Sequence, residues 1–286
     1  VMGYYTEAPY FLMAVLFLMG TQSAFFGPLK YSILPDHLRD DELIGGNALI
    51  EGATFLAILI GTIAGGLIIL TERGTEITSI AVVAFAVLGW ATSRSIPEAP
   101  AAAPDLKVSF NIATETWRMI GFAREKKTVF MSVLGISWFW VVGATFLSQF
   151  PNFTKLVLGG DETVVTLFMA MFSIGIGLGS LWCNKLLGGK ISARYVAVGG
   201  LAMTAFMVDL AIVTWNSTPA VGSMINASGF MAETTNWRIL FDLLAISMAA
   251  GIYTVPLYAI LQHDSERQHR SRTIAANNIL NALFMV

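Results

Sequence analysis

Charged residues are scarce in this sequence. They make up 13% of 286 residues, whereas about a quarter is usual in a soluble domain. The hydrophobic share is 55% and the mean hydropathy is +0.67. So few charges cannot keep so apolar a chain in water, which excludes an ordinary soluble globule and indicates a protein that lies mostly in lipid. The net charge of −2 gives no sign of a nucleic-acid partner.

Cysteine and histidine are also scarce, and this excludes several kinds of catalytic site. Cys183 is the single cysteine, so no intrachain disulfide can form. The three histidines (His37, His263 and His269) stand in polar connections without cysteines or carboxylates at metal-ligand spacing. A Gly-x-Ser-x-Gly motif and a P-loop are both absent. We therefore predict no catalytic residue, no metal and no cofactor, and a membrane-embedded enzyme is the least supported function.

Long apolar segments take the place of charge. Seven of them come close to the roughly 20 residues that a helix needs to cross a bilayer, and an eighth runs from about Thr273 to the last residue. The fold class is therefore predicted to be all-α and membrane-embedded. The seven spans are predicted at 9–29, 48–70, 77–92, 129–150, 164–187, 195–215 and 237–261.

Basic residues are distributed unevenly over the connections between these spans. Of the 17 lysines and arginines, all but Arg73, Lys155 and Arg238 lie in alternate connections. The positive-inside rule places that larger set on the cytoplasmic side. The longest such connection, 93–128, starts with a proline-rich stretch. It continues with apolar residues at helical spacing, which predict an amphipathic helix at the membrane face: Phe110, Ala113, Trp117 and Ile120.

One motif occurs twice. Gly-Pro-Leu-Lys-Tyr-Ser-Ile-Leu at 27–34 aligns with Val-Pro-Leu-Tyr-Ala-Ile-Leu at 255–261 once Lys30 is left out. A second match follows each copy, with 44–51 corresponding to 274–281. Five apolar segments separate the two copies, so the repeat unit is six helices. A six-helix unit used twice is typical of secondary transporters, whose substrate site lies between the halves.

The repeat also divides the chain. We predict an incomplete N-terminal bundle at 1–92, from the end of helix 3 to helix 6 of a twelve-helix protein. A cytoplasmic linker follows at 93–128, and an incomplete C-terminal bundle at 129–286 holds helix 7 to part of helix 11. The chain starts without Met and stops inside an apolar run, so we expect a fragment.

Polar residues inside the spans are candidates for binding or gating, because they are costly in lipid. Lys30 has no counterpart in the second copy, and it is either a snorkelling anchor or a point charge for a phosphate. Asn47 and Glu51 lie one helical turn apart, and Asn277 and Asn281 repeat that spacing. This pattern predicts a gate or a headgroup site, with helix capping as the alternative for Asn47 and Asn277.

Three further charges lie toward the outer ends of their spans. Asp209 is the most isolated, and it either binds a coupling cation, carries a proton or simply reaches the outer interface. Arg238 and Asp242 are one turn apart and are predicted to form an ordinary surface ion pair.

Small residues also recur at helical spacing in two spans. Such stripes allow close helix packing or sliding. The residues predicted for helix packing are Gly61, Gly65 and Gly66 in the second span and Gly175 and Gly179 in the fifth.

Three segments, 20–35, 46–52 and 272–285, resemble the bacterial lysophospholipid transporters of the major facilitator superfamily, in particular the transporter part of fusions with an acyltransferase. The resemblance implies two six-helix bundles in the bacterial inner membrane, of which this sequence covers about helix 4 to part of helix 11. It also implies that lysophospholipids of the lysophosphatidylethanolamine class move toward the cytoplasmic leaflet by alternating access. A fused or associated acyltransferase would lie outside the sequence.

Two other functions fit the same features. A major facilitator exporter of amphipathic drugs would share the glycine stripes and the lack of ATP-binding motifs. A non-transporting membrane anchor for a fused acyltransferase would need no substrate path at all.

Overall fold

The computed structural model describes residues 9–69, 71–105, 109, 111–215, 217 and 224–286. Apart from one isolated bridge between Gly160 and Ile225, the regular structure in these residues is helical. The elements are α2 (Pro9–Ser32), α3 (Leu34–His37), α4 (Asp40–Ile69), α5 (Gly74–Ser93), α6 (Ile112–Glu125), α7 (Lys127–Leu156), α8 (Glu162–Leu187), α9 (Val196–Thr214), α10 (Ala227–Ala232), α11 (Asn236–Asp264) and α12 (Arg270–Met285).

The predicted spans are confirmed. Seven helices in the described part of the chain are long and apolar enough to cross a membrane: α2, α4, α5, α7, α8, α9 and α11. The predicted eighth segment is α12, which begins three residues before Thr273. Local sequence explains the helix ends. Asp161 accepts hydrogen bonds from the backbone N–H groups of Thr163 and Val164 at the start of α8, and Gly188 ends α8 with a φ of 56°.

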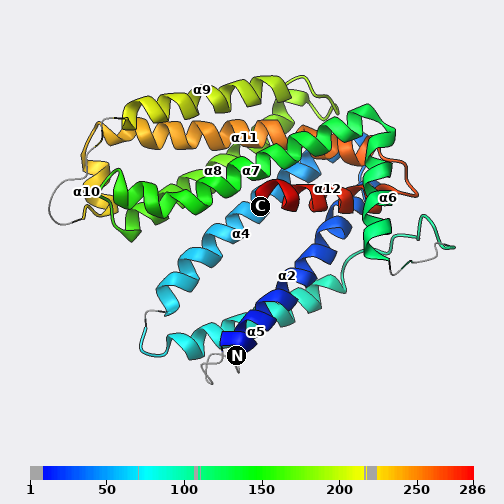
Figure 1. The fold of residues 1–286 in the computed structure, drawn as a ribbon, viewed down its shortest axis with the longest axis horizontal. Coiled ribbons are helices and arrows are strands. Elements are labelled where there is room, and N and C mark those ends of the chain that lie inside the picture. The colour runs from blue at the N-terminus through cyan, green and yellow to red at the C-terminus, as the bar shows by residue number, and fades with distance from the viewer. Residues whose placement is uncertain (1–8, 70, 106–108, 110, 216, 218–223) are drawn as a thin grey trace.

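The helices form two groups (Figure 1). In one group, α11 packs against α7, α8 and α9. The other group contains α2, α4 and α5; α4 packs against α5, and it has a more extensive interface with α8 and further contacts with α11. α2 lies against α12. The contacts of α4 and α2 therefore join segments that are more than a hundred residues apart in the sequence.

The main hydrophobic core lies in the α7–α8–α11 group. Aromatic rings from α7, α8 and α10 interlock there, mostly edge to face, which is a favourable geometry for aromatic pairs. The fully buried rings of this core are Phe139, Phe150, Phe168, Phe172 and Phe230.

Glycines bring the backbones of α8 and α11 into contact. A Cβ atom at Gly251 would lie 2.6 Å from the Ile176 carbonyl oxygen. A Cβ atom at Gly175 would collide with Ser247, and one at Gly179 would collide with the Met248 carbonyl group. This close crossing fixes the positions of α8 and α11 relative to each other, and with them the residues on both helices.

The predicted helix in the linker is present as α6. Glu115 of α6 is buried and forms ion pairs with Arg118 on the same helix and with Arg272 on α12. Trp117 is 72% exposed, as expected for a side chain that faces lipid or headgroups. Phe110, which the predicted apolar face included, lies outside the described residues. The linker helix is thus fixed to the start of α12 by a buried carboxylate.

Candidate functional site

The two copies of the repeated motif meet in space. α2 and α4 carry the first copy, and α11 and α12 carry the second. The rings of Tyr31 and Tyr258, which occupy equivalent positions in the alignment, stack with centroids 4.4 Å apart and planes 7° from parallel. Both side chains are buried. The repeat therefore places its two tyrosines at the contact between the halves.

Charged groups of the first copy surround Tyr31. The Tyr31 hydroxyl donates a hydrogen bond to Oε1 of Glu51 at 2.7 Å, and Glu51 is buried. The ammonium group of Lys30 lies 4.7 Å from the centroid of the Tyr31 ring. It also donates to the Thr54 hydroxyl at 3.4 Å. A cation and a carboxylate thus lie beside one tyrosine, within a region that otherwise has few charges.

Asn47 joins the first copy to the second. Its Nδ2 donates to Oε1 of Gln262 at 2.7 Å, and Nε2 of Gln262 donates back to Oδ1 of Asn47 at 2.9 Å. Both amides are fully buried. Because Asn47 lies in the interior of α4 and bonds across to α11, the capping interpretation does not describe it.

The second copy is bonded mainly to α7. The indole N–H of Trp140 donates to the Tyr258 hydroxyl at 3.2 Å, and the Ser137 hydroxyl donates to the amide oxygen of Asn281 at 2.8 Å. Asn277 is fully buried and lies beside the Tyr258 hydroxyl, but neither atom of its amide has a well-aligned hydrogen-bond partner among the described residues. An unpaired buried amide is costly in a folded protein. Asn277 is therefore a group that a ligand or a water molecule can satisfy.

Ion pairs continue this contact toward the predicted cytoplasmic end. Asp36 on α3 lies 3.4 Å from a guanidinium nitrogen of Arg270 and 3.6 Å from one of Arg267. A Cβ atom at Gly189, in the connection after α8, would meet the Asp41 carbonyl group at the start of α4. Together with the stacked tyrosines, these contacts hold the predicted cytoplasmic ends of the two groups of helices together.

The outer-end charges are arranged differently from the prediction. Arg238 does not form a surface pair with Asp242; instead its Nε lies 3.0 Å from Oδ2 of Asp209. The prediction was wrong because Asp242 faces inward on α11 and is only 1% exposed. The Asp209 side chain is 32% exposed, so its pairing fits the interface interpretation. A coupling role for Asp209 stays a prediction.

The comparisons with known proteins agree with this arrangement. The family model described as Major Facilitator Superfamily matches residues 1–286. The chain belongs to this superfamily. It is accordingly a multi-pass integral membrane protein of a transporter superfamily, which bears out the predicted fold class.

The curated proteins that match this chain are distant relatives. The chain is 28% identical over 258 residues to the "Lysophospholipid transporter LplT" of Serratia proteamaculans, covering 86% of this chain and 56% of that protein. The protein of the same name from Klebsiella pneumoniae is 28% identical over 253 residues, with the same coverage. The one from Salmonella newport is 27% identical over 270 residues, covering 92% of this chain and 60% of that protein. No solved structure matches.

This major facilitator chain thus spans a little over half the length of the curated relatives it matches. The positions of its domains, 1–92, 93–128 and 129–286, stay predictions, as does the role of each site residue.

Three residues of the site in this superfamily member were not among the predicted site residues. In the sequence, Tyr31 and Tyr258 serve only to align the two copies, although equivalent positions in a two-fold repeat are expected to meet near its axis. Gln262 lies four residues after Tyr258, so the same helix face carries both. That spacing is the sequence signal that could have identified Gln262.

The glycines predicted for helix packing fall into two sets. Gly175 and Gly179 lie at the α8–α11 crossing described above. At Gly61, Gly65 and Gly66, no atom of another described segment lies within 4 Å of the Cβ position. The close approach of α4 to α8 occurs instead at Gly52, where a Cβ atom would lie 3.6 Å from Cα of Gly177.

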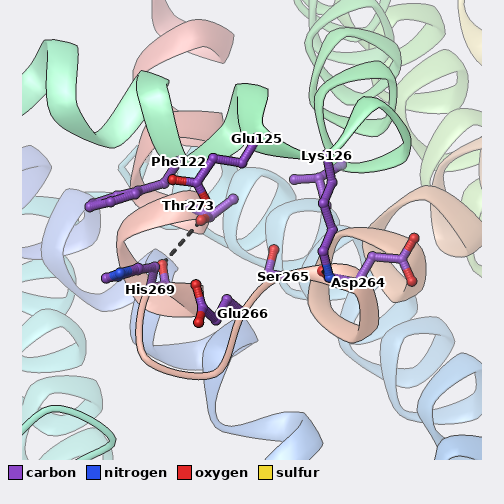
Figure 2. A pocket seen from close by; sticks show the side chains of 9 residues that line it. Phe122, Glu125, Lys126, Asp264, Ser265, Glu266, His269 and Thr273 are labelled. Atoms are coloured by element: carbon purple, nitrogen blue, oxygen red, sulfur yellow. Dashed lines mark hydrogen bonds between the residues drawn. The ribbon is translucent and has the colours of Figure 1, made fainter.

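A separate cavity of about 420 Å³ lies below the linker helix (Figure 2). Glu125 and Lys126 enter it from the α6–α7 junction, and Asp264 and Glu266 enter it from the α11–α12 connection. The Lys126 ammonium group donates to the Asp264 carbonyl oxygen at 2.8 Å. The lining of this cavity has three carboxylates and one lysine, so it is unsuited to binding a phosphate. None of the predicted site residues lines the cavity.

Proposed function

We propose that the complete protein moves lysophospholipids of the lysophosphatidylethanolamine class toward the cytoplasmic leaflet by alternating access. The observation that carries this proposal is the placement of Lys30 and Glu51 beside Tyr31, where the two copies meet. The distant similarity to proteins named lysophospholipid transporters supports the substrate class.

The charges suit a zwitterionic headgroup. A phosphate is bound well by the point charge of a lysine, and an ammonium group pairs well with a buried carboxylate. Lys30 would take the phosphate and Glu51 the ammonium group. A single acyl chain requires no polar partner, and in this proposal it would stay in the apolar surroundings of the spans.

The stacked tyrosines act as the gate in this proposal. The Tyr31–Tyr258 stack and the Asn47–Gln262 pair join the two copies beside the buried Glu51 and the half-buried Lys30, and in this proposal they would close the path to the predicted cytoplasmic side. Rocking of the halves would separate these contacts and release the headgroup, as in alternating access. The linker helix α6, held by Glu115 to Arg272 of α12, would move with the second half.

The test is uptake of labelled lysophosphatidylethanolamine by cells that produce the full-length protein, with empty cells as the background. We expect uptake that depends on the protein and falls when Lys30 is replaced by alanine. A protein that reaches the membrane but gives no uptake above background would contradict the proposal. Efflux of amphipathic drugs by the same cells would then favour the exporter, and no movement of either compound would favour the acyltransferase anchor.

A further inference from the structure

The linker helix α6 has two different faces, and the inner one packs against the protein. Ala123 on this face is fully buried. Met119 and Ile120 pack against the hydrophobic cluster that contains Tyr31 and Tyr258. Part of the apolar surface of α6 is therefore used inside the protein, in the same cluster as the stacked tyrosines.

The outer face of α6 combines an indole ring with cations. Trp117 is 72% exposed. Arg124 is also exposed, and it follows two helical turns after Trp117, on the same side of the helix. The Arg118 side chain is 55% exposed, and Lys126 and Lys127 are exposed directly after the helix. The surface that α6 turns away from the protein is thus aromatic and basic.

Carboxylates compensate these cations only in part. Arg118 is paired with Glu115. In the described part of the chain, Arg124 and Lys127 form no ion pair, and the Arg124 guanidinium group lies over an aromatic ring of α7 instead. Glu125, which stands between them in the sequence, enters the cavity on the other side of α6 (Figure 2). Positive charge therefore remains available on the outer face.

The position of α6 suits contact with lipid headgroups. The helix lies crosswise at the end of the molecule where α7 begins and α11 ends (Figure 1), and it packs on α7 and α12. This end is the predicted cytoplasmic side. Helices that lie in a membrane interface present tryptophan together with lysine and arginine, and the cytoplasmic leaflet carries anionic lipids that attract such clusters.

We propose that the outer face of α6 binds the headgroups of anionic phospholipids in the cytoplasmic leaflet. The phosphate groups lie against Arg124 and Lys127, and the indole of Trp117 lies at the headgroup level. A zwitterionic headgroup fits less well, because it would bring an ammonium group close to these cations. No covalent bond changes in this binding.

Bound lipid would act on the contact between the two copies. A headgroup on the outer face holds α6 against the cluster that contains Tyr31 and Tyr258. The ion pair of Glu115 with Arg272 connects the same helix to the start of α12. The lipid composition of the cytoplasmic leaflet would therefore change the stability of this contact.

The first test is binding of fluorescently labelled phosphatidylglycerol to the purified full-length protein in detergent, with labelled phosphatidylcholine as the comparison. An excess of lysophosphatidylethanolamine occupies the proposed substrate site. The unmodified protein should bind phosphatidylglycerol more tightly than phosphatidylcholine. The double variant Arg124→Gln/Lys127→Gln should bind phosphatidylglycerol more weakly, by about fivefold for each cation removed.

Arg39→Gln is the matched control. Arg39 is an exposed arginine at the predicted cytoplasmic end, but its guanidinium group is already paired with Asp41 and Glu42. This variant should bind phosphatidylglycerol like the unmodified protein. Equal binding of the two lipids, an unweakened double variant, or displacement of phosphatidylglycerol by lysophosphatidylethanolamine would overturn the proposal. No binding by the unmodified protein would also overturn it and would leave the face to a protein partner.

A second measurement follows the effect of the lipid on stability. A ligand that binds only the folded protein raises its unfolding temperature. Phosphatidylglycerol should therefore raise the unfolding temperature of the unmodified protein and of Arg39→Gln, and raise that of the double variant much less. The rise should shrink at about 1 M salt, where exposed charges are screened beyond about 3 Å. An equal rise in the double variant, or one that salt leaves unchanged, would contradict binding by these cations.

Discussion

The two copies of the repeat have the same form but different charge. Each is a helix with an internal proline, a short connection and a second helix, and each presents one tyrosine to the other copy. The first copy adds Lys30 and Glu51, whereas the second has no residue at the place of Lys30 and has Asn281 at the place of Glu51.

The two copies also differ in the hydrogen-bond partners of their polar groups. The polar groups of the second copy are tied to α7 of their own half, through Trp140 and Ser137. Glu51 of the first copy is bonded to Tyr31 of the same copy, and Lys30 contacts Tyr31 and Thr54, which also belong to the N-terminal half. We infer that the second copy is the fixed support and that the first copy recognises the charged parts of the substrate.

The largest expected effect follows removal of the Glu51 charge. Glu51→Gln keeps an acceptor for the Tyr31 hydroxyl but cannot pair with an ammonium group. Uptake of lysophosphatidylethanolamine by the full-length protein should fall about tenfold to a hundredfold, as expected for a lost charge-assisted hydrogen bond. If Asn281→Ala lowers uptake as much, the two copies are equivalent and the comparison fails.

Lys30 should have the next largest effect. Lys30→Ala should reduce uptake about tenfold, because a phosphate would lose its cation, and Lys30→Arg should retain more activity than alanine. Lys185→Ala is the control, since Lys185 is an exposed lysine near the end of α8. Equal uptake by the Lys30→Ala and Lys185→Ala proteins would reduce Lys30 to an interface anchor.

Replacing each tyrosine by phenylalanine should distinguish the roles of the two copies. Both substitutions preserve the ring stack. Tyr31→Phe leaves the buried Glu51 carboxylate without its donor, whereas Tyr258→Phe removes the acceptor of the Trp140 N–H and leaves no carboxylate unpaired. We expect about a fivefold loss of uptake for Tyr31→Phe and less than about twofold for Tyr258→Phe, in line with the stronger bonds of charged groups. The reverse order would show that the second copy is the more sensitive one.

A smaller effect is expected for the amide pair that joins the copies. Asn47→Ala or Gln262→Ala leaves the partner amide buried and unpaired, which should destabilise the purified full-length protein by about 1 kcal/mol. The double variant should be less destabilised than the sum of the two single variants, because one lost interaction is shared. Thermal unfolding in detergent measures this, and strict additivity would argue that the two amides do not interact.

The smallest effect is expected outside both copies. The hydrogen bond from Thr163 lowers the pKa of Asp161 below its ordinary value. This cap therefore stabilises α8 above the pKa of the unfolded carboxyl group, and the contribution disappears as the pH falls through the folded pKa. Asp161→Ala should lower the unfolding temperature slightly at neutral pH and not at strongly acidic pH, without changing lysolipid selectivity.

The sequence predicted the features that depend on local composition. Long apolar runs located the seven spans, and the repeat anticipated which segments would correspond in the two halves. The stacking of Tyr31 on Tyr258 is the three-dimensional consequence of that repeat.

The sequence could not predict which helix face is buried. α9 and α11 are apolar on nearly every side, so periodicity does not show that Asp242 faces the core while Arg238 reaches α9. The Asn47–Gln262 pair joins residues 215 positions apart, and no local pattern connects them. The packing of α4 through Gly52 rather than through Gly61 and Gly65 also depends on helix rotation.

The most direct test of the central claim is headgroup selectivity. Uptake of lysophosphatidylethanolamine and of lysophosphatidylglycerol, which has no ammonium group, would be measured side by side for the unmodified full-length protein and for Glu51→Gln. If Glu51 recognises the ammonium group, the substitution should lower uptake of the first lipid much more than uptake of the second. An equal loss for both lipids would contradict the account and would make Glu51 a structural partner of Tyr31.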